Sequence, residues 1–216
     1  DWPKEVTVGF RAGAPLLELK LEIDSIEYLD LRNDCEAQLQ RIVGEFIVGE
    51  NDDSLASVVV ELLQKRQQQI TVAESCTGGM IASQITGVSG VSSVFEAGFI
   101  TYSNAIKQQI LGVDSDLIEQ YGSVSEDVVR AMALGALDSA SADCVIAVSG
   151  IAGPKGGTAE KPVGTVWIAW GSKDNLQAQR FNYPVGRQFF QTMISALALD
   201  LVRRFLLGST SLPDYF

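Results

Sequence analysis

Short apolar runs that end in small polar residues or glycine recur along most of the chain. Such runs occur within residues 70–73, 95–104 and 143–154, and their length and β-branched content are typical of buried strands. Between them, apolar residues recur at intervals of three and four, which indicates helices that bury one face. This alternation predicts an α/β fold, a three-layer α/β/α domain with a mixed sheet.

The segments around these runs extend the pattern. From Leu55 to Leu63, apolar residues fall at helical intervals, which predicts a helix with one buried stripe. Ser123 followed by Glu126 predicts a capping box at the start of a helix that runs to about residue 140. The remaining expected elements are two strands and a long C-terminal helix: 162–171, 177–183 and the segment that opens at Val185.

The beginning of the chain has a different pattern. Residues 2–10 and 16–23 alternate imperfectly between apolar and polar positions, and the turn signal Gly13-Ala14-Pro15 separates them. Residues 35–46 then have helical spacing, so we expect a small α+β lobe of the β-β-α type. The chain is expected to divide into three parts: the lobe (1–50), an α/β domain (51–207) and a loose tail (208–216).

Composition limits the classes of partner. At 216 residues the chain can bury a sizeable core, and its 20% charged residues are ordinary for a globular protein. The formal net charge of −11 argues against nucleic-acid binding, which requires a basic surface. A small anionic ligand remains compatible with this charge, because a few local cations and a helix dipole are sufficient to bind it. No apolar stretch has transmembrane length, so we expect no membrane partner.

The cysteine and histidine contents limit the chemistry. Cys35, Cys76 and Cys144 lack metal-binding spacing and are expected to be reduced thiols in a cytoplasmic protein without a bound metal. The chain contains no histidine, which excludes Ser-His-Asp and Cys-His machinery. Acid–base chemistry near neutral pH must therefore use lysine, tyrosine, cysteine, a carboxylate or water, and a serine activated by lysine is one such arrangement.

The segment 71–79 carries the strongest candidate chemistry. Its apolar residues break into Glu74, Ser75, Cys76 and a glycine pair before helical spacing begins, which indicates a strand, a tight turn and a helix N-terminus. Free N–H groups and the helix dipole make such a turn an anion site, and Ser75 is a candidate nucleophile. The alternatives are that the turn only caps the helix, that Glu74 holds it through backbone hydrogen bonds, or that Cys76 is the nucleophile.

Together with three downstream segments, this turn resembles the C-terminal domain of the competence-damage-inducible protein CinA family. The resemblance covers roughly residues 55–207, and the segments match in order and spacing: 95–107, 143–154 and 161–170. It implies an amidohydrolase that converts nicotinamide mononucleotide to nicotinic acid mononucleotide and ammonia. The lobe resembles the tail of the family's middle domain, so we expect the chain to be a fragment of a longer protein.

The resemblance and the residue chemistry together suggest roles for eleven residues. The expected catalytic residues are Ser75, Ser92, Tyr102 and Lys107. The expected substrate-binding residues are Thr77, Gly78, Gly79, Asn104, Ser149, Gly150 and Arg187. Ser92 is assigned by the resemblance alone, whereas Arg187 at a helix start opposes the dipole and therefore suggests a phosphate contact.

Each assignment has a simpler alternative. Lys107 and Arg187 could be solvated surface residues without a role in the site. Ser92 could belong to a solvated loop, and Tyr102 could be an aromatic residue of the core. The sequence also leaves open whether a serine attacks the amide or orients an attacking water. The overall hypothesis is a metal- and cofactor-independent amidohydrolase of pyridine-nucleotide recycling that acts as a homodimer. The alternatives are a related nucleotide or amide hydrolase and a degenerate module that only binds a ligand or partner.

Overall fold

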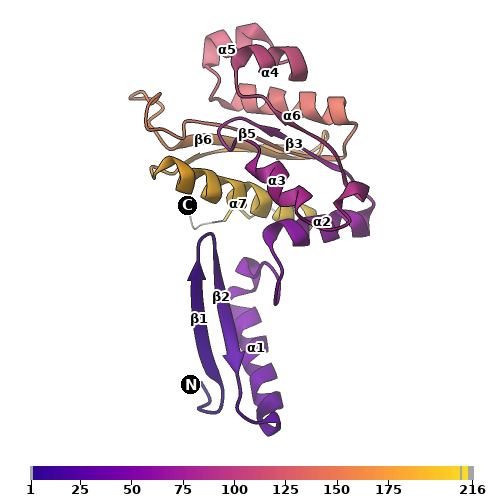
Figure 1. Ribbon diagram of the computed structural model, residues 1–216, viewed down its shortest axis with the longest axis vertical. Helices are drawn as coiled ribbons and strands as arrows, with labels where there is room; N and C mark the ends of the chain where they lie inside the picture. Colours follow the sequence, from indigo (N-terminus) through magenta and orange to yellow (C-terminus); the bar gives the residue numbers. More distant parts are fainter. Residues whose placement is uncertain (1, 210, 214–216) are drawn as a thin grey trace. The chain divides into compact units, whose positions relative to one another are not determined.

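The computed structural model describes residues 2–209 and 211–213. The chain forms two compact units, residues 1–50 and residues 51–216. The first unit contains, in chain order, β1 (Thr7–Gly13), β2 (Leu16–Glu22), η1 (Ile26–Tyr28), α1 (Leu29–Val43) and η2 (Gly44–Phe46). Its two strands form a sheet of their own, separate from the sheet of the second unit (Figure 1).

The first unit is an antiparallel hairpin followed by a helix, as the sequence predicts. The strands are joined across Ala14 and Pro15. Strand β1 begins later than expected, because the N–H of Val6 donates to the carbonyl of Pro3 in a turn (3.3 Å) ahead of the strand. Among the described residues of this unit only Val6 and Cys35 are buried, so its own core is small.

The second unit holds the remaining elements: α2 (Leu55–Arg66), β3 (Ile70–Glu74), α3 (Met80–Thr86), η3 (Val91–Ser93), β4 (Phe95–Ile100), α4 (Asn104–Leu111), α5 (Ser115–Tyr121), α6 (Glu126–Ala140), β5 (Cys144–Gly150), β6 (Thr165–Gly171), β7 (Leu176–Asn182) and α7 (Arg187–Leu206). Its five strands lie in the order β4-β3-β5-β6-β7. Strand β3 is parallel to both β4 and β5, whereas β6 is antiparallel to β5 and β7. The sheet is therefore mixed, which confirms the prediction.

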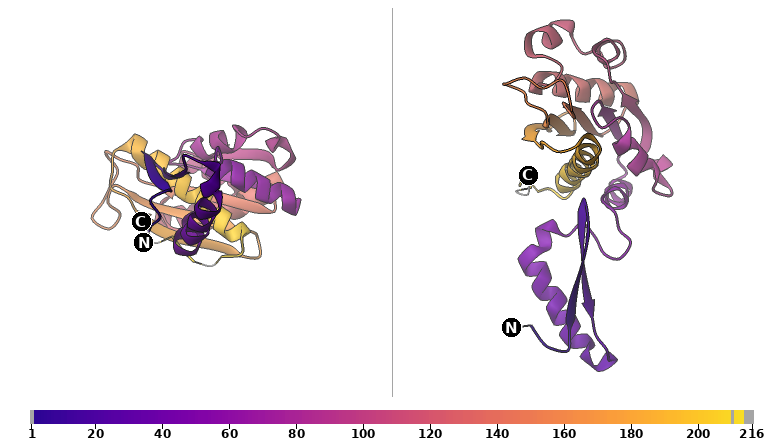
Figure 2. Two further views of the ribbon diagram at one scale, coloured as in Figure 1. Left: turned by 90° about the horizontal axis from the view of Figure 1, so that it is seen from below. Right: turned by 60° about the vertical axis from the view of Figure 1, so that its left-hand side comes forward.

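Helices cover both faces of this sheet. Helices α4, α5 and α6 lie on one face and α2, α3 and α7 on the other, as Figures 1 and 2 show. Burial on both faces explains why β3 and β5 consist of nearly uninterrupted apolar residues instead of an alternating pattern. The three-layer α/β/α prediction is confirmed.

Three serines cap helices in this unit, Ser54, Ser103 and Ser125, and the last of them corrects the sequence interpretation. Ser54 and Ser57 form a reciprocal capping box at the start of α2. Helix α6 ends at Ala140 as predicted, but its N-cap is Ser125, whose hydroxyl accepts from the N–H of Val128 (3.4 Å). Ser123 does not cap this helix, and its carbonyl instead accepts a hydrogen bond from β5.

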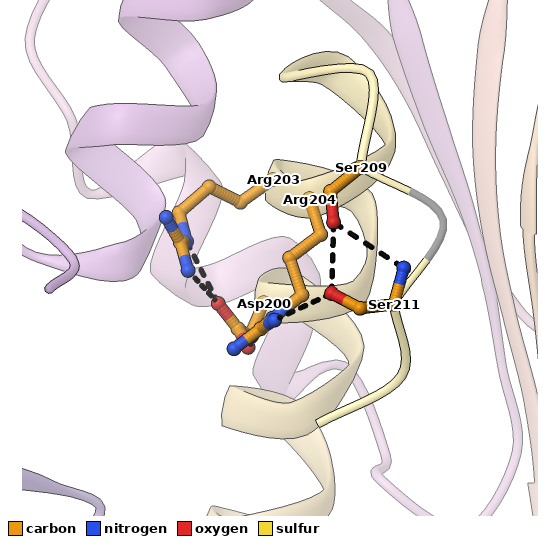
Figure 3. Close-up of polar contacts among 5 residues, drawn as sticks. All are labelled: Asp200, Arg203, Arg204, Ser209 and Ser211. Carbon is orange, nitrogen blue, oxygen red and sulfur yellow. Dashed lines mark hydrogen bonds and ion pairs between the residues drawn. The ribbon is translucent and has the colours of Figure 1, made fainter. Parts of the chain in front are cut away.

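The end of α7 contains a buried ionic cluster (Figure 3). Asp200 pairs with Arg203 (2.6 Å) and Arg204 (2.8 Å), and each of the three side chains is 5% exposed. Such charges are costly to bury unless they are paired. Arg204 also donates to Ser211 (3.3 Å), which ties part of the expected loose tail to the helix, while residues 210 and 214–216 of that tail lie outside the described residues. Within the described ranges, no helix is long and apolar enough to cross a membrane.

Candidate active site

Glu74 organises the turn that follows β3. Its side chain is fully buried, and its carboxylate accepts from the N–H groups of Gly79 (3.0 Å), Ile81 (3.2 Å) and Ala82 (2.8 Å). These donors are the ones that a helix N-terminus would offer to an anion. The expectation that the start of α3 binds phosphate is therefore corrected, because a carboxylate of the protein already occupies it.

The glycine pair shapes the turn instead of binding substrate through its N–H groups. Gly78 and Gly79 have φ angles of 65° and 95°, which other residues rarely adopt. The N–H of Gly78 donates to the Ser75 carbonyl (3.2 Å), and that of Gly79 is taken by Glu74. The expected substrate-binding role of these two glycines is thus replaced by a conformational one.

Two amide groups of the turn remain available. Within the described residues, the N–H groups of Cys76 and Thr77 donate to no other residue, and that of Cys76 faces only the sulfur of its own side chain. The carbonyl of Cys76 accepts from the Nε2 of Gln191 (2.8 Å), and the hydroxyl of Thr77 is buried without a hydrogen-bond partner. The turn thus presents polar groups with unused hydrogen-bonding capacity directly after Ser75.

Lys107 is buried beside Ser75. Its residue is 1% exposed, and its Nζ lies 3.2 Å from the Oγ of Ser75. The same nitrogen donates to the carbonyls of Thr101 (2.7 Å) and Tyr102 (3.4 Å). Burial lowers the pKa of Lys107 below the usual lysine value, because the charged amine loses its hydration. The surface-lysine alternative is therefore wrong.

The three contacts of the Lys107 amine match the three N–H donors of an ammonium, with the Ser75 oxygen as the third acceptor. Because burial lowers the pKa of this amine, loss of one proton leaves a lone pair 3.2 Å from the hydroxyl of Ser75. Ser75 lies at the carboxyl end of β3, where its own N–H donates to the carbonyl of Val148 in β5 (3.1 Å).

Cys76 is unsuited to be the nucleophile. Burial raises the pKa of its thiol to about 12, so the reactive thiolate is not formed near neutral pH. A Cβ atom added to Gly150 would lie 3.0 Å from the Cys76 sulfur. Gly150 therefore provides the space in which this thiol packs, and the two residues hold the turn against β5.

Arg187 and Tyr102 form a second polar group near the same turn. Arg187 is the first residue of α7, and its Nη2 donates to the Tyr102 hydroxyl (3.0 Å) while Nη1 donates to the Gly153 carbonyl (3.1 Å). Tyr102 thus contacts Lys107 through its carbonyl and Arg187 through its side chain. The Tyr102 hydroxyl accepts from Arg187, and no hydrogen bond joins it to Lys107 among the described residues, so its expected catalytic role stays a prediction.

Three other candidates lie differently from expectation. The hydroxyl of Ser149 is buried and donates to the Ser123 carbonyl (2.6 Å), so it joins β5 to the segment before α6. Ser92 is exposed on η3, ahead of β4. Because β3 and β4 are parallel, Ser92 lies at the edge of the sheet opposite to Ser75, and the chain does not bring the two serines together. Asn104 is exposed at the start of α4.

Sequence reasoning missed Gln191 and the carbonyl of Thr101. Gln191 lies four residues after Arg187 on α7, so both side chains project from one face of that helix. This spacing is the local signal that could have identified Gln191. Its partner Cys76 is 115 residues away, so the contact itself leaves no local pattern. Across the described ranges, no group of three His, Cys, Asp or Glu side chains is placed to hold a metal ion.

The fold and this site define a three-layer α/β domain with a buried serine–lysine pair at the carboxyl edge of a mixed sheet. Residues 52–206 match the family model described as the CinA C-terminal domain. The chain belongs to this family.

Relatives and solved structures agree with this assignment. A CinA-like protein of Colwellia psychrerythraea is 49% identical over the whole of this chain, and the match covers 50% of that protein. A CinA-like protein of Parasynechococcus marenigrum is 49% identical over 83% of this chain, and the match covers 43% of that protein. The chain thus spans about half the length of these relatives. A CinA superfamily protein from Klebsiella pneumoniae has a TM-score of 0.70 at 31% identity, covering 74% of this chain and 99% of its own. The competence/damage inducible protein CihA from Agrobacterium tumefaciens has a TM-score of 0.68 at 37% identity, covering 70% and 93%.

Proposed function

We propose that this chain is an amidohydrolase that converts nicotinamide mononucleotide and water to nicotinic acid mononucleotide and ammonia. The observation that carries the proposal is the buried Lys107 amine, 3.2 Å from the Ser75 hydroxyl and without an ion pair among the described side chains. A lysine with a lowered pKa beside a serine is an activated nucleophile that needs no histidine. The CinA family membership supports the choice of substrate.

The reaction proceeds in two steps. The Ser75 oxygen attacks the carboxamide carbon while its proton passes to Lys107, and the carbonyl electron pair moves onto oxygen. When this intermediate collapses, the C–N bond breaks and the proton on Lys107 is transferred to the leaving nitrogen, which releases ammonia. Water then attacks the acyl-serine with Lys107 as base, and the carboxylate product leaves with Ser75 regenerated.

The available amides of the turn stabilise the negative oxygen. The N–H of Cys76 follows the nucleophile directly, and that of Thr77 is the next along the chain. Donors that are held in place before the reaction stabilise such an oxyanion without further rearrangement. Thr77 was already among the residues expected to bind substrate, whereas Cys76 takes the place of Gly78, Gly79 and Gly150 in this proposal.

Arg187 binds the phosphate of the nucleotide. It uses two hydrogen bonds to hold Gly153 and Tyr102, which leaves further N–H donors on a partly exposed guanidinium. The guanidinium matches the geometry of a phosphate better than an ammonium does. The local positive charge at the start of α7 allows an anion to bind despite the overall net charge of −11.

The direct test is ammonia release from nicotinamide mononucleotide by this protein, with and without a chelator. We expect turnover in both conditions, because the proposed chemistry uses only protein groups and water. Nicotinamide riboside and nicotinamide are the comparison substrates, and both should be poor because they lack the phosphate. Absence of ammonia from the mononucleotide, or turnover lost to the chelator and restored by a divalent ion, would contradict the proposal.

Deletion of residues 1–50 is expected to leave the rate of ammonia release nearly unchanged. The described groups assigned to catalysis all lie in the unit of residues 51–216, and helix α2 begins with its own capping box at Ser54. The measurement compares kcat and the thermal unfolding of the full chain and the shortened protein. A shortened protein that folds but is inactive would mean that the lobe contributes to the site.

A further inference from the structure

Gln191 is a half-buried link between α7 and the turn that carries Ser75. Its Nε2 donates to the carbonyl of Cys76 (2.8 Å), 115 residues earlier in the chain. A Cβ atom added to Gly78 would lie 3.7 Å from this nitrogen, so the side chain also packs against the turn. The contact is unrelated to the α3 cap that Glu74 provides.

The contact determines the orientation of one peptide group. In a trans peptide the C=O and N–H groups point in opposite directions. Because the carbonyl of Cys76 points to Gln191, the N–H of Thr77 in the same peptide points away from it. Among the described residues, this N–H has no backbone acceptor.

The preceding peptide is held in the same way. The carbonyl of Ser75 accepts from the N–H of Gly78 (3.2 Å), so the N–H of Cys76 points away from the inside of the turn. Both peptides therefore have an occupied carbonyl and an amide that donates to no other described residue. The first is held by the turn itself, whereas the second depends on a side chain from α7.

We infer that Gln191 is a positioning residue, which holds the Cys76–Thr77 peptide so that the Thr77 N–H stabilises the oxyanion of the reaction. The inference rests on the proposed function. Gln191 also shares its helix face with Arg187, so a single rigid helix sets the separation between the phosphate anchor and the oxyanion donor.

The test replaces Gln191 with methionine, which keeps the length of the side chain and removes its donor. Gln188→Met on the same helix is the matched control, because Gln188 is exposed and has no assigned role. Loss of an oxyanion donor typically lowers kcat by roughly 10²- to 10³-fold. A donor that is only misoriented should cost less, and we expect a fall in kcat of about 10- to 100-fold with little change in KM.

The pH profile separates positioning from a general structural effect. Gln191 bonds to Cys76 and Lys107 to Ser75, and no described hydrogen bond joins the two side chains. The midpoint of the rate against pH should therefore be the same in Gln191→Met and in the unmodified protein. Unchanged kcat in Gln191→Met would overturn the inference. A shifted midpoint, or an equal loss in Gln188→Met, would also overturn it, because either would reflect disturbance of the whole site or helix.

A second probe makes the test independent of the nucleotide. A fluorophosphonate phosphorylates an activated serine with loss of fluoride, and its rate of attachment to Ser75 is measured by mass spectrometry. We expect slower labelling of Gln191→Met than of the control. If the unmodified protein is labelled at Ser75 but releases no ammonia, the proposed substrate is wrong and the labelling rates still decide the role of Gln191. No labelling of the unmodified protein would overturn both.

Discussion

Replacing Ser75 with alanine is expected to abolish measurable ammonia release. The hydroxyl is the proposed nucleophile, and loss of a nucleophile that acts together with its base lowers kcat on the order of 10⁴- to 10⁶-fold. The variant should fold, because the N–H of Ser75 keeps its bond to Val148 and the hydroxyl contacts only Lys107 among the described groups. Binding of the mononucleotide should persist, since Arg187 is unchanged.

The comparison uses steady-state kinetics and a rapid-quench search for an acyl-enzyme. Ser83→Ala is the control, because Ser83 is an exposed serine of α3, and it should react normally. In the unmodified protein, a covalent adduct on Ser75 should accumulate or be trapped. If Ser75→Ala stays active, or if Ser92→Ala is the inactive variant, the assignment of Ser75 as nucleophile is wrong.

Replacing Lys107 with methionine is expected to lower kcat by about 10²- to 10⁴-fold, because general-base catalysis typically contributes this factor. It corresponds to about 3 to 5 kcal/mol at the barrier. Methionine keeps much of the volume of the buried stem but accepts no proton. The variant leaves the carbonyls of Thr101 and Tyr102 without their donor, and each such loss costs about 1–3 kcal/mol of stability. Thermal unfolding must therefore accompany the kinetics.

Lys65→Met is the matched control for this variant. Lys65 lies on α2, its side chain is 67% exposed, and it pairs with Glu61 of the same helix, so its loss should leave the rate unchanged. A folded Lys107→Met protein with normal kcat would exclude Lys107 as the base. If Lys107→Met does not fold, Lys107→Arg is the substitute variant. Arginine keeps the N–H donors but stays protonated, so this variant should be equally inactive.

The pH dependence of the rate is a second test of Lys107 as the general base. Protonated lysine cannot accept the serine proton, so activity should rise with pH through the pKa of this group. Burial lowers that pKa, and the rise should therefore occur at lower pH than for a solvated lysine. The same limb should disappear in Lys107→Met. A profile that is flat, or that rises only in the range of an unperturbed lysine, would contradict the proposed base.

The alternation of apolar runs and helical spacing was enough to predict the strands, the long helices and the layers of the second unit, but not the short elements α5 and η3. The apolar runs at β3 and β5 are buried on both faces, and this environment requires the residue types that make such runs recognisable. The local pattern made Ser75 a candidate, because a strand that ends in small polar residues before a helix marks the carboxyl edge of a sheet, but its expected catalytic role also depended on the family resemblance.

The partners of the site residues came only from the tertiary structure. Lys107 lies between exposed residues on α4, and its burial depends on how that helix meets Ser75 and the end of β4. Ser92 precedes β4, which is parallel to β3, and it therefore lies at the edge of the sheet opposite to Ser75. Gln191 contacts Cys76 across 115 residues. Periodicity reports which side of an element is buried, whereas strand order and helix packing decide which side chains meet, and these long-range choices leave little trace in any local stretch of sequence.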